Sequence, residues 1–498
     1  GNNTLRSVTS GAQNVAIGDN AMGSMQTGSV NIAIGAGSME SASKGVSNIA
    51  IGAFAQRNND SANYNVAIGH SSLYHNDSIR NVAIGYEALA YNNRKDNLSI
   101  GYRAGYLNNY LQTNPDLGVE NTYVGFLSGY YLNTGNQNTA LGYRALFGAG
   151  YFNLDDPGNQ AYKRNVAIGD SALTNAFGND NVAVGFKALS NSYNTSLHTA
   201  VGSRALSTTR ATYPNTAIGY SSQDSATTGG ANTSVGSYSL AMNKTGTNNT
   251  AIGNAAMYEA YNPQGLNYPY DNTAVGNDAL RFTRYYGHVA IGAGALRNDT
   301  SGVYNTAVGY LSMYNNLSGY YNVALGTSAL RSNTTGFANT AIGTNSMFNH
   351  KSDSYNTSVG FESMINDTSG GLNTAIGWRS LRIAKSGEEN TALGVGTLEF
   401  TDSSLANTAV GRGAMIGSFN VTSDLAYNTS IGYYAGAYMD SVEFVSAVGA
   451  WAGHRNQGKE NTFMGYNSGY GFVGSGLTGI ENSGFGSHTL VYNTTGKS

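Results

Sequence analysis

Apolar and polar positions recur along the chain in a five-residue unit, N-[T/V]-A-[I/V/L]-G, seen from Asn14 to Gly18 and again from Asn339 to Gly343. The unit occurs 27 times, and of the 26 intervals between its closing glycines, 16 are 17 residues and 5 are 16. A fixed period of this length is typical of a solenoid, in which each coil is stable only when it stacks on its neighbours. We therefore expect one coil wound many times rather than three globular domains.

The repeat predicts β structure. A coil of 17 residues has room for two or three short strands and tight corners but not for a helical hairpin, and the unit is rich in β-branched residues. We expect an all-β parallel solenoid of about 27 coils that is continuous over residues 11–486, with residues 1–10 as an N-terminal lead-in or cap and 487–498 as a C-terminal cap or lead-out. At about 4.8 Å per strand, such a stack would extend roughly 130 Å.

Two columns of the repeat are expected to be structural. The first residue of the unit is Asn in 24 copies, among them Asn14 and Asn339, and stacked Asn side chains form hydrogen-bonded ladders. The closing glycine, as in Gly18 and Gly343, predicts a corner with a positive φ or a close backbone approach.

The apolar columns predict which side chains form the core. The residue before the glycine is Ile, Val or Leu in 25 copies, for example Ile17 and Ile342, and we expect it to point inward with the Thr or Val two positions earlier. A column of Leu or Met, four residues after the glycine, would close the core from the other side. The Ala between, as in Ala341, is then expected on the outer face, either packed against another chain or facing solvent.

Composition excludes several classes of protein. Charged residues make up only 11% of the chain, but the strict period argues against disorder. A net charge of −3 gives no basic surface for nucleic acid, and no apolar run is long enough to enter a bilayer. The absence of cysteine excludes a disulfide scaffold and fits an extracellular or virion protein. Because the chain begins at Gly1 without a signal-like segment, we expect it to be a fragment or a processed form.

Candidate binding residues lie where the period lengthens. Five long intervals predict loops near residues 105–120, 147–164, 257–271, 415–427 and 470–481. Aromatic loops on a rigid scaffold suit recognition of a glycan or a protein, since Tyr combines a stacking face with a polar group; the alternative is tolerated insertions. The candidate receptor contacts are Tyr106, Tyr110, Tyr151, Phe152, Tyr162, Tyr258, Tyr261, Tyr268 and Tyr270.

Catalysis has little support in the sequence. The seven histidines are scattered, and the only adjacent carboxylate pair, Asp155-Asp156, lies beside Pro157-Gly158, which is typical of a turn or an adventitious calcium site. We assign no catalytic, cofactor-binding or metal-binding residues.

The repeat unit resembles the head repeats of trimeric autotransporter adhesins, the YadA-like head, and is similar to repeat tracts in bacteriophage tail fibres and tail spikes. The resemblance covers residues 11–486, although the period here is longer than in adhesin heads. It implies a left-handed parallel β-roll wound as a homotrimer.

The expected function is that of a structural and adhesive fibre, part of a phage tail fibre or virion appendage that presents host-binding elements. The alternative is a bacterial surface adhesin or extracellular filament; a glycan-degrading spike and an ice-binding protein are weaker hypotheses. Expected partners are two further copies of the chain, a host cell-surface glycan or protein receptor, and other virion or fibre components. We expect no nucleic acid partner and no membrane insertion, at an extracellular location on a virion or cell surface.

Overall fold

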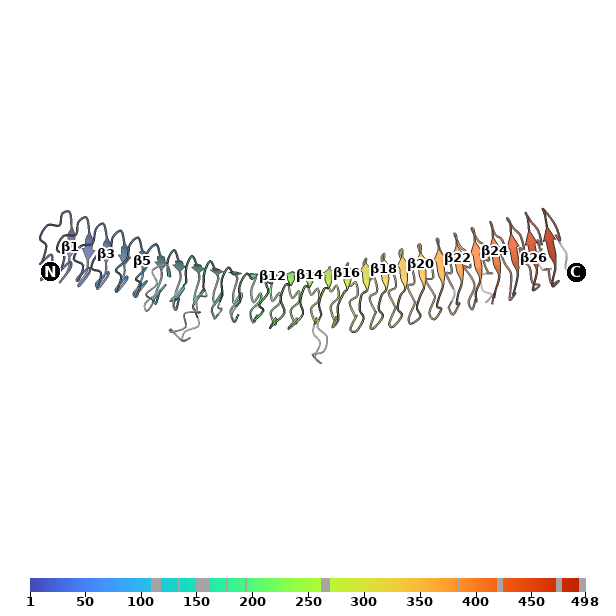
Figure 1. Cartoon of the computed structure of the whole chain (residues 1–498), viewed down its shortest axis with the longest axis horizontal. Coiled ribbons are helices and arrows are strands. Elements are labelled where there is room, and N and C mark those ends of the chain that lie inside the picture. Colours follow the sequence, from blue (N-terminus) through green and yellow to red (C-terminus); the bar gives the residue numbers. More distant parts are fainter. Residues whose placement is uncertain are drawn as a thin grey trace. The chain divides into compact units, whose positions relative to one another are not determined.

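The computed structural model describes residues 1–108, 118–132, 135–148, 162–175, 178–192, 195–260, 269–383, 385–418, 424–471 and 477–491. The chain divides into two compact units, Gly1–Asn248 and Asn249–Ser498. The described residues contain 27 strands of three residues each and no helix, one strand for each copy of the repeat (Figure 1). The expected all-β solenoid with a period of about 17 residues is confirmed.

The strands of the first unit are β1 (Val15–Ile17), β2 (Ile32–Ile34), β3 (Ile49–Ile51), β4 (Val66–Ile68), β5 (Val82–Ile84), β6 (Leu98–Ile100), β7 (Thr122–Val124), β8 (Thr139–Leu141), β9 (Val166–Ile168), β10 (Val182–Val184), β11 (Thr199–Val201), β12 (Thr216–Ile218) and β13 (Thr233–Val235). Those of the second unit are β14 (Thr250–Ile252), β15 (Thr273–Val275), β16 (Val289–Ile291), β17 (Thr306–Val308), β18 (Val323–Leu325), β19 (Thr340–Ile342), β20 (Thr357–Val359), β21 (Thr374–Ile376), β22 (Thr391–Leu393), β23 (Thr408–Val410), β24 (Thr429–Ile431), β25 (Ser446–Val448), β26 (Thr462–Met464) and β27 (Ser483–Phe485).

Within each unit, every strand pairs in parallel with the strands of the adjacent coils, in register. Ala16 lies opposite Ala33 in the first unit, and Ala341 lies opposite Ser358 in the second. Equivalent positions of successive coils therefore stack directly on one another, so a column in the sequence alignment is a column in space.

The orientation of the strands is the reverse of the expected one. The central Ala341 is fully buried, whereas Ile342 beside it is only half-buried and Ile17 is 58% exposed. The coil is thin, and its interior is already filled from the opposite side by buried Leu and Met side chains such as Leu330 and Met347. Only a small residue fits at the strand centre, so Ala points inward and both flanking columns point outward.

Two coils test this explanation. Tyr123, at the centre of β7, is fully buried in the Ala column, and the Leu or Met of its own coil and of the preceding coil is replaced by Gly129 and Gly105. A Cβ at Gly105 would lie 2.8 Å from Cδ2 of Tyr123, and one at Gly129 would collide with the other edge of the ring. Phe463 in β26 is accommodated in the same way by Gly453 and Gly469.

The closing glycines meet both conditions predicted for them. Gly343 has a φ of 127°, and a Cβ at this position would lie 2.5 Å from the carbonyl oxygen of Gly360 in the next coil. Any side chain would therefore both strain the corner and separate the stacked coils.

The Asn column forms the predicted ladder. The Oδ1 of Asn31 accepts the backbone N–H of Asn48 at 3.0 Å and its Nδ2 group at 3.1 Å, and the Nδ2 of Asn48 also donates to the carbonyl of Ala62 at 2.8 Å. The amide thus joins its coil to the next one and satisfies buried backbone groups at the corner.

The ends of the described chain also contact the stack. Leu5 and Val8 pack against the core of the first coils, and the N–H of Leu5 donates to the carbonyl of Ala21 at 3.1 Å. Near the other end, the N–H of Gly469 donates to the carbonyl of Thr489 at 2.8 Å.

The volume exchange around Tyr123 predicts a specific double-mutant result. Tyr123→Ala should destabilise the protein by about 3–5 kcal/mol because it leaves a cavity, and Gly129→Leu alone should also destabilise it because the new side chain collides with the ring. Combined, the two should recover much of the loss, since Ala140 and Leu146 form this pair in the next coil and Leu146 has the same left-handed backbone. Urea unfolding followed by circular dichroism measures the coupling; simple addition of the two losses would contradict the explanation.

Candidate receptor-contact surface

The structure describes some of the aromatic residues predicted to contact a receptor. Tyr106, Tyr162, Tyr258 and Tyr270 are among the described residues. The remaining predicted contacts and the Asp155-Asp156 pair lie outside the described residues: Tyr110, Tyr151, Phe152, Tyr261 and Tyr268.

Tyr106 belongs to a ladder of stacked rings that continues into the neighbouring coils. Its ring centroid lies 5.0 Å from that of Tyr130, which in turn lies 5.4 Å from that of Phe147, and the planes are within 11° of parallel. All three are the fifth residue after a closing glycine, so the register of the coils places them in one column. The structure thus brings together aromatic residues flanking two different predicted loops.

Two arginine side chains cover this ladder, and one of them pairs with a carboxylate. The guanidinium of Arg103 lies 5.1 Å from the Tyr106 ring and 2.6 Å from a carboxylate oxygen of Glu87. The guanidinium of Arg144 lies 4.3 Å from the Phe147 ring. Burial raises the pKa of Tyr106, so its phenol stays protonated and can donate a hydrogen bond at neutral pH.

Tyr162 does not belong to a receptor-contact surface. It is 7% exposed and is part of the hydrophobic core of the first unit, where its backbone carbonyl accepts the Nδ2 group of Asn138 at 2.6 Å. The interval length alone does not show at which residue the coil resumes. Tyr162 lies within a long interval of the sequence, but its side chain is buried in the core.

The two other described candidates lie in the second unit. Tyr270 is exposed and stacks on Tyr286 with centroids 4.5 Å apart. Tyr258 is half-buried, with the guanidinium of Arg281 5.2 Å from its ring.

The regular coils carry further ladders that the sequence analysis missed. In the first unit, Tyr86, Tyr102, Phe126 and Tyr143 stack at 5.0 to 5.4 Å, and each is the first residue after a closing glycine. These rings are 39 to 48% exposed. The signal in the sequence is an aromatic residue directly after the closing glycine in four successive coils.

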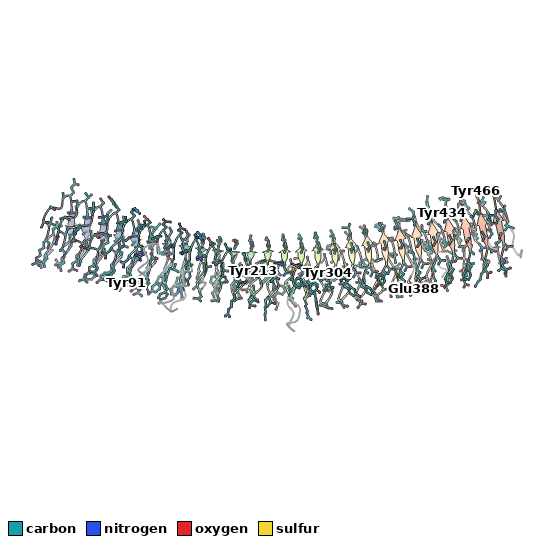
Figure 2. All side chains as sticks on the ribbon, viewed as in Figure 1. Tyr91, Tyr213, Tyr304, Glu388, Tyr434 and Tyr466 are labelled. Atoms are coloured by element: carbon teal, nitrogen blue, oxygen red, sulfur yellow. The ribbon has the colours of Figure 1, made fainter. Side chains whose placement is uncertain are left out.

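The ladder that begins at Tyr270 and Tyr286 continues through five more rings. Tyr286 contacts Tyr304 edge to face, and Tyr304 stacks on Tyr321 at 5.4 Å. The further members, each in contact with the one before, are Tyr320, Phe337 and Tyr355. Figure 2 labels Tyr304, Tyr434 and Tyr466 among the side chains of this unit.

Stacking limits what these ladders can bind. In a parallel stack the two faces of each inner ring are covered by its neighbours, so only ring edges and phenol hydroxyls face solvent. A stacking platform for sugar rings needs an open face. The ladders therefore stabilise the stack of coils, by about 0.5–1.5 kcal/mol per pair. They are poorly suited to bind a sugar ring by stacking.

The outward strand face presents an apolar surface that repeats along the described coils. In β1 to β6 both outward columns are aliphatic, as in Val15 and Ile17, and both residues of that pair are exposed. From β19 to β24 one column is Thr and the other is aliphatic. Exposed apolar patches of this extent in soluble proteins mark interaction surfaces.

Two histidines replace Asn in the ladder and copy its hydrogen bonds. Nδ1 of His198 accepts the backbone N–H of Asn215 at 3.0 Å, while Nε2 lies 3.3 Å from the carbonyl of Ala211 and donates to it. His288 makes the equivalent contacts, with Nε2 3.0 Å from the carbonyl of Gly302. One acceptor and one donor are what a neutral imidazole offers, and burial lowers the pKa of His198 to about 4.

Neither a metal centre nor a membrane helix emerges from the part of the chain that the structure describes. It holds no group of three or more His, Asp or Glu side chains placed to bind a metal ion, and no helix able to span a bilayer. Comparison of the chain with models of known protein families and with curated proteins found no match.

The ladder geometry of His198 predicts acid sensitivity. Its pKa falls from about 6.5 in the unfolded chain to about 4 in the folded one. The unfolded state therefore binds the proton more readily, and stability is lost as the pH falls from about 6.5 to 4, by up to about 3 kcal/mol. His198→Asn, which restores the usual ladder residue, should remove this part of the pH dependence of urea unfolding.

The matched control is His488→Asn, at an exposed histidine. It should leave the pH dependence as in the parent. An unchanged slope in His198→Asn would contradict the assignment of a neutral ladder histidine.

Proposed function

We propose that the chain is a segment of an extracellular structural and adhesive fibre, part of a phage tail fibre or a similar virion appendage that presents host-binding elements. The observation that carries this proposal is the in-register stack of identical coils within each unit. Thirteen coils at about 4.8 Å extend a unit by roughly 60 Å, which suits a spacer better than an enclosed catalytic site. A bacterial surface adhesin or filament is the second candidate, because the repeat unit resembles that of adhesin heads as closely.

The proposed fibre is a left-handed homotrimer in parallel register. The burial of Ala excludes the Ala column as the contact between chains, and the outward face takes its place in the proposal. Its aliphatic columns, such as Ile252, Ile291 and Ile342, would lose contact with water in such an assembly. Since each column repeats at every coil, three identical chains can meet along their length with the same contacts.

A charge on the outward face should block assembly without unfolding the coil. Replacing Ile252, Ile291 and Ile342 together by Lys should reduce the native mass from that of three chains to about 52.1 kDa, because three buried ammonium groups are strongly unfavourable. Sedimentation equilibrium gives the mass, and circular dichroism checks that the β signal persists.

The control carries the same added charge elsewhere in the unit. Lys at Ser301, Thr335 and Ser369, exposed turn positions, should leave the trimer intact. A single-chain mass for the parent would reject the trimer.

The proposed host contacts are the three aromatic long loops, which each have a unique sequence while the coils repeat. Because Phe147 and Tyr162 belong to the coils, the segments to replace by short Gly-Ser linkers are residues 109–117, 149–161 and 261–268. The variant should keep its fold, since surface loops contribute little to stability, but should lose attachment to host cells. Attachment equal to that of the parent in a cell-binding assay would place the receptor contact outside these loops.

A further inference from the structure

A polar hollow of about 330 Å³ lies on the first unit, and none of its lining residues belongs to the predicted receptor loops. Its lining residues are Ser41, Asn58, Asn59, Asp60, His75, Asn76, Asp77 and Asn93. We propose that this hollow binds an uncharged glycan; the proposal rests on the adhesive function proposed above and adds a binding site and a ligand class to it.

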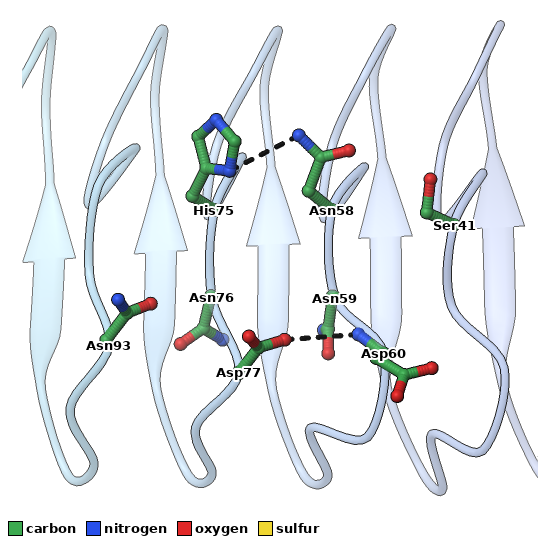
Figure 3. A pocket seen from close by; sticks show the side chains of 8 residues that line it. All are labelled: Ser41, Asn58, Asn59, Asp60, His75, Asn76, Asp77 and Asn93. Carbon is green, nitrogen blue, oxygen red and sulfur yellow. Dashed lines mark hydrogen bonds between the residues drawn. The ribbon is translucent and has the colours of Figure 1, made fainter.

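The hollow is built from two rows of side chains that the coil register places side by side (Figure 3). Ser41, Asn58 and His75 are the sixth residues after closing glycines and form one row. The other row contains the eighth residues: Asp60, Asp77 and Asn93. Because alternate side chains of an extended segment point the same way, the sixth and eighth residues both face outward.

The floor and rims of the hollow are fixed before any ligand arrives. Asn59 and Asn76, between the two rows, also line the hollow and are only 1% exposed. Isolated parallel bridges join Asn58 to His75 and His75 to Tyr91, so three successive coils are hydrogen-bonded along one rim. A preorganised site loses less conformational entropy on binding than a mobile loop does.

The hollow presents both donors and acceptors. The Nδ2 group of Asn58 lies 3.3 Å from Nδ1 of His75, which assigns Nδ1 as the acceptor and leaves the proton on Nε2. Asp77 accepts the backbone N–H of Asp60 at 3.2 Å through Oδ1, so its Oδ2 stays open to a ligand. Sugar hydroxyls, which donate and accept at once, match such a mixed set.

The charge of the hollow selects against anionic ligands. Asp60 and Asp77 occupy the same position in adjacent coils, and among the described residues neither forms an ion pair with a cationic side chain. Carboxylates accept hydrogen bonds from neutral hydroxyls more strongly than amides do, but repel sulfate, phosphate and carboxylate groups. Sialylated and phosphorylated glycans are therefore disfavoured.

Two tyrosine rings pack against the imidazole of His75 at one rim of the hollow. Tyr91 stacks on His75 with centroids 5.3 Å apart, and Tyr74 meets the same imidazole edge to face at 4.8 Å. Burial lowers the pKa of His75, which keeps the ring neutral at neutral pH. These ring contacts hold the imidazole of His75 in place at the rim of the hollow, where it lines the site.

The test measures binding of neutral oligosaccharides by the complete chain. Isothermal titration uses maltoheptaose, mannan oligosaccharides and galactan oligosaccharides, with sialyllactose and Ca²⁺ as competing ligand classes. The parent should bind at least one neutral oligosaccharide, and Asp60→Asn with Asp77→Asn should weaken binding at least tenfold while preserving shape. His75→Phe, which keeps the ring contacts but loses the Nε2 donor, should also weaken it.

Asp440→Asn is the matched control, an exposed acid in the second unit. It should bind as the parent does. Absence of binding to every neutral oligosaccharide, binding of sialyllactose or Ca²⁺ alone, or equal affinities of the parent and the Asp60→Asn, Asp77→Asn variant would each overturn the proposal.

The experiments can refute the proposed glycan site without refuting the proposed fibre function, and the reverse. If the Asp60→Asn, Asp77→Asn variant keeps both its glycan affinity and its host attachment, the hollow is excluded and the fibre proposal stands. If the parent has a single-chain mass and attaches to no host cell, the fibre proposal fails regardless of the titration. The variant with replaced loops should retain glycan binding, because the hollow lies outside all three replaced segments.

Discussion

Stacking of equivalent residues in register is the constraint on which the rest of this structure depends. Each strand has only three residues and could not persist alone, but its neighbours above and below repeat the same backbone geometry. The closing glycine sets how close two coils can lie, because its missing Cβ leaves room for the carbonyl of the next coil. Asn ladders, aromatic ladders and the polar hollow all follow from this register, since one residue at a fixed position becomes a column.

The sequence was sufficient for the fold because its period is regular. The Asn31 to Asn48 contacts and the backbone at Gly343 agree with the roles derived from residue type alone. Residue type alone could not show which face of each strand points into the core. Alternation shows that Ala341 and Ile342 point to opposite sides, but which side is the interior depends on how much volume the Leu and Met column already fills.

The candidate site was less accessible to sequence reasoning. Interval lengths predict loops but do not separate a coil residue such as Tyr162 from a surface residue. The relation between Tyr106 and Phe147 needs the intermediate Tyr130, which lies in a coil of ordinary length. No sequence motif marks the hollow. Its two rows come from the sixth and eighth positions of successive coils, and only the register of the coils brings them together.

Val445 gives the Asn ladder of the second unit a distinct boundary. Its backbone N–H donates to the Oδ1 of Asn428 at 2.8 Å, but its side chain has no atom to accept the N–H of Asn461 in the next coil. The side-chain Nδ2 group of Asn461 donates to Oδ1 of Asn456 within its own coil at 3.0 Å. Cooperativity in a solenoid passes from neighbour to neighbour, so the lost hydrogen bond weakens the contact between two coils whose strands, β25 and β26, remain paired in register. The step from Val445 to Asn461 is therefore held by backbone pairing without the side-chain ladder, and the stack opens more easily here than at a step from Asn to Asn.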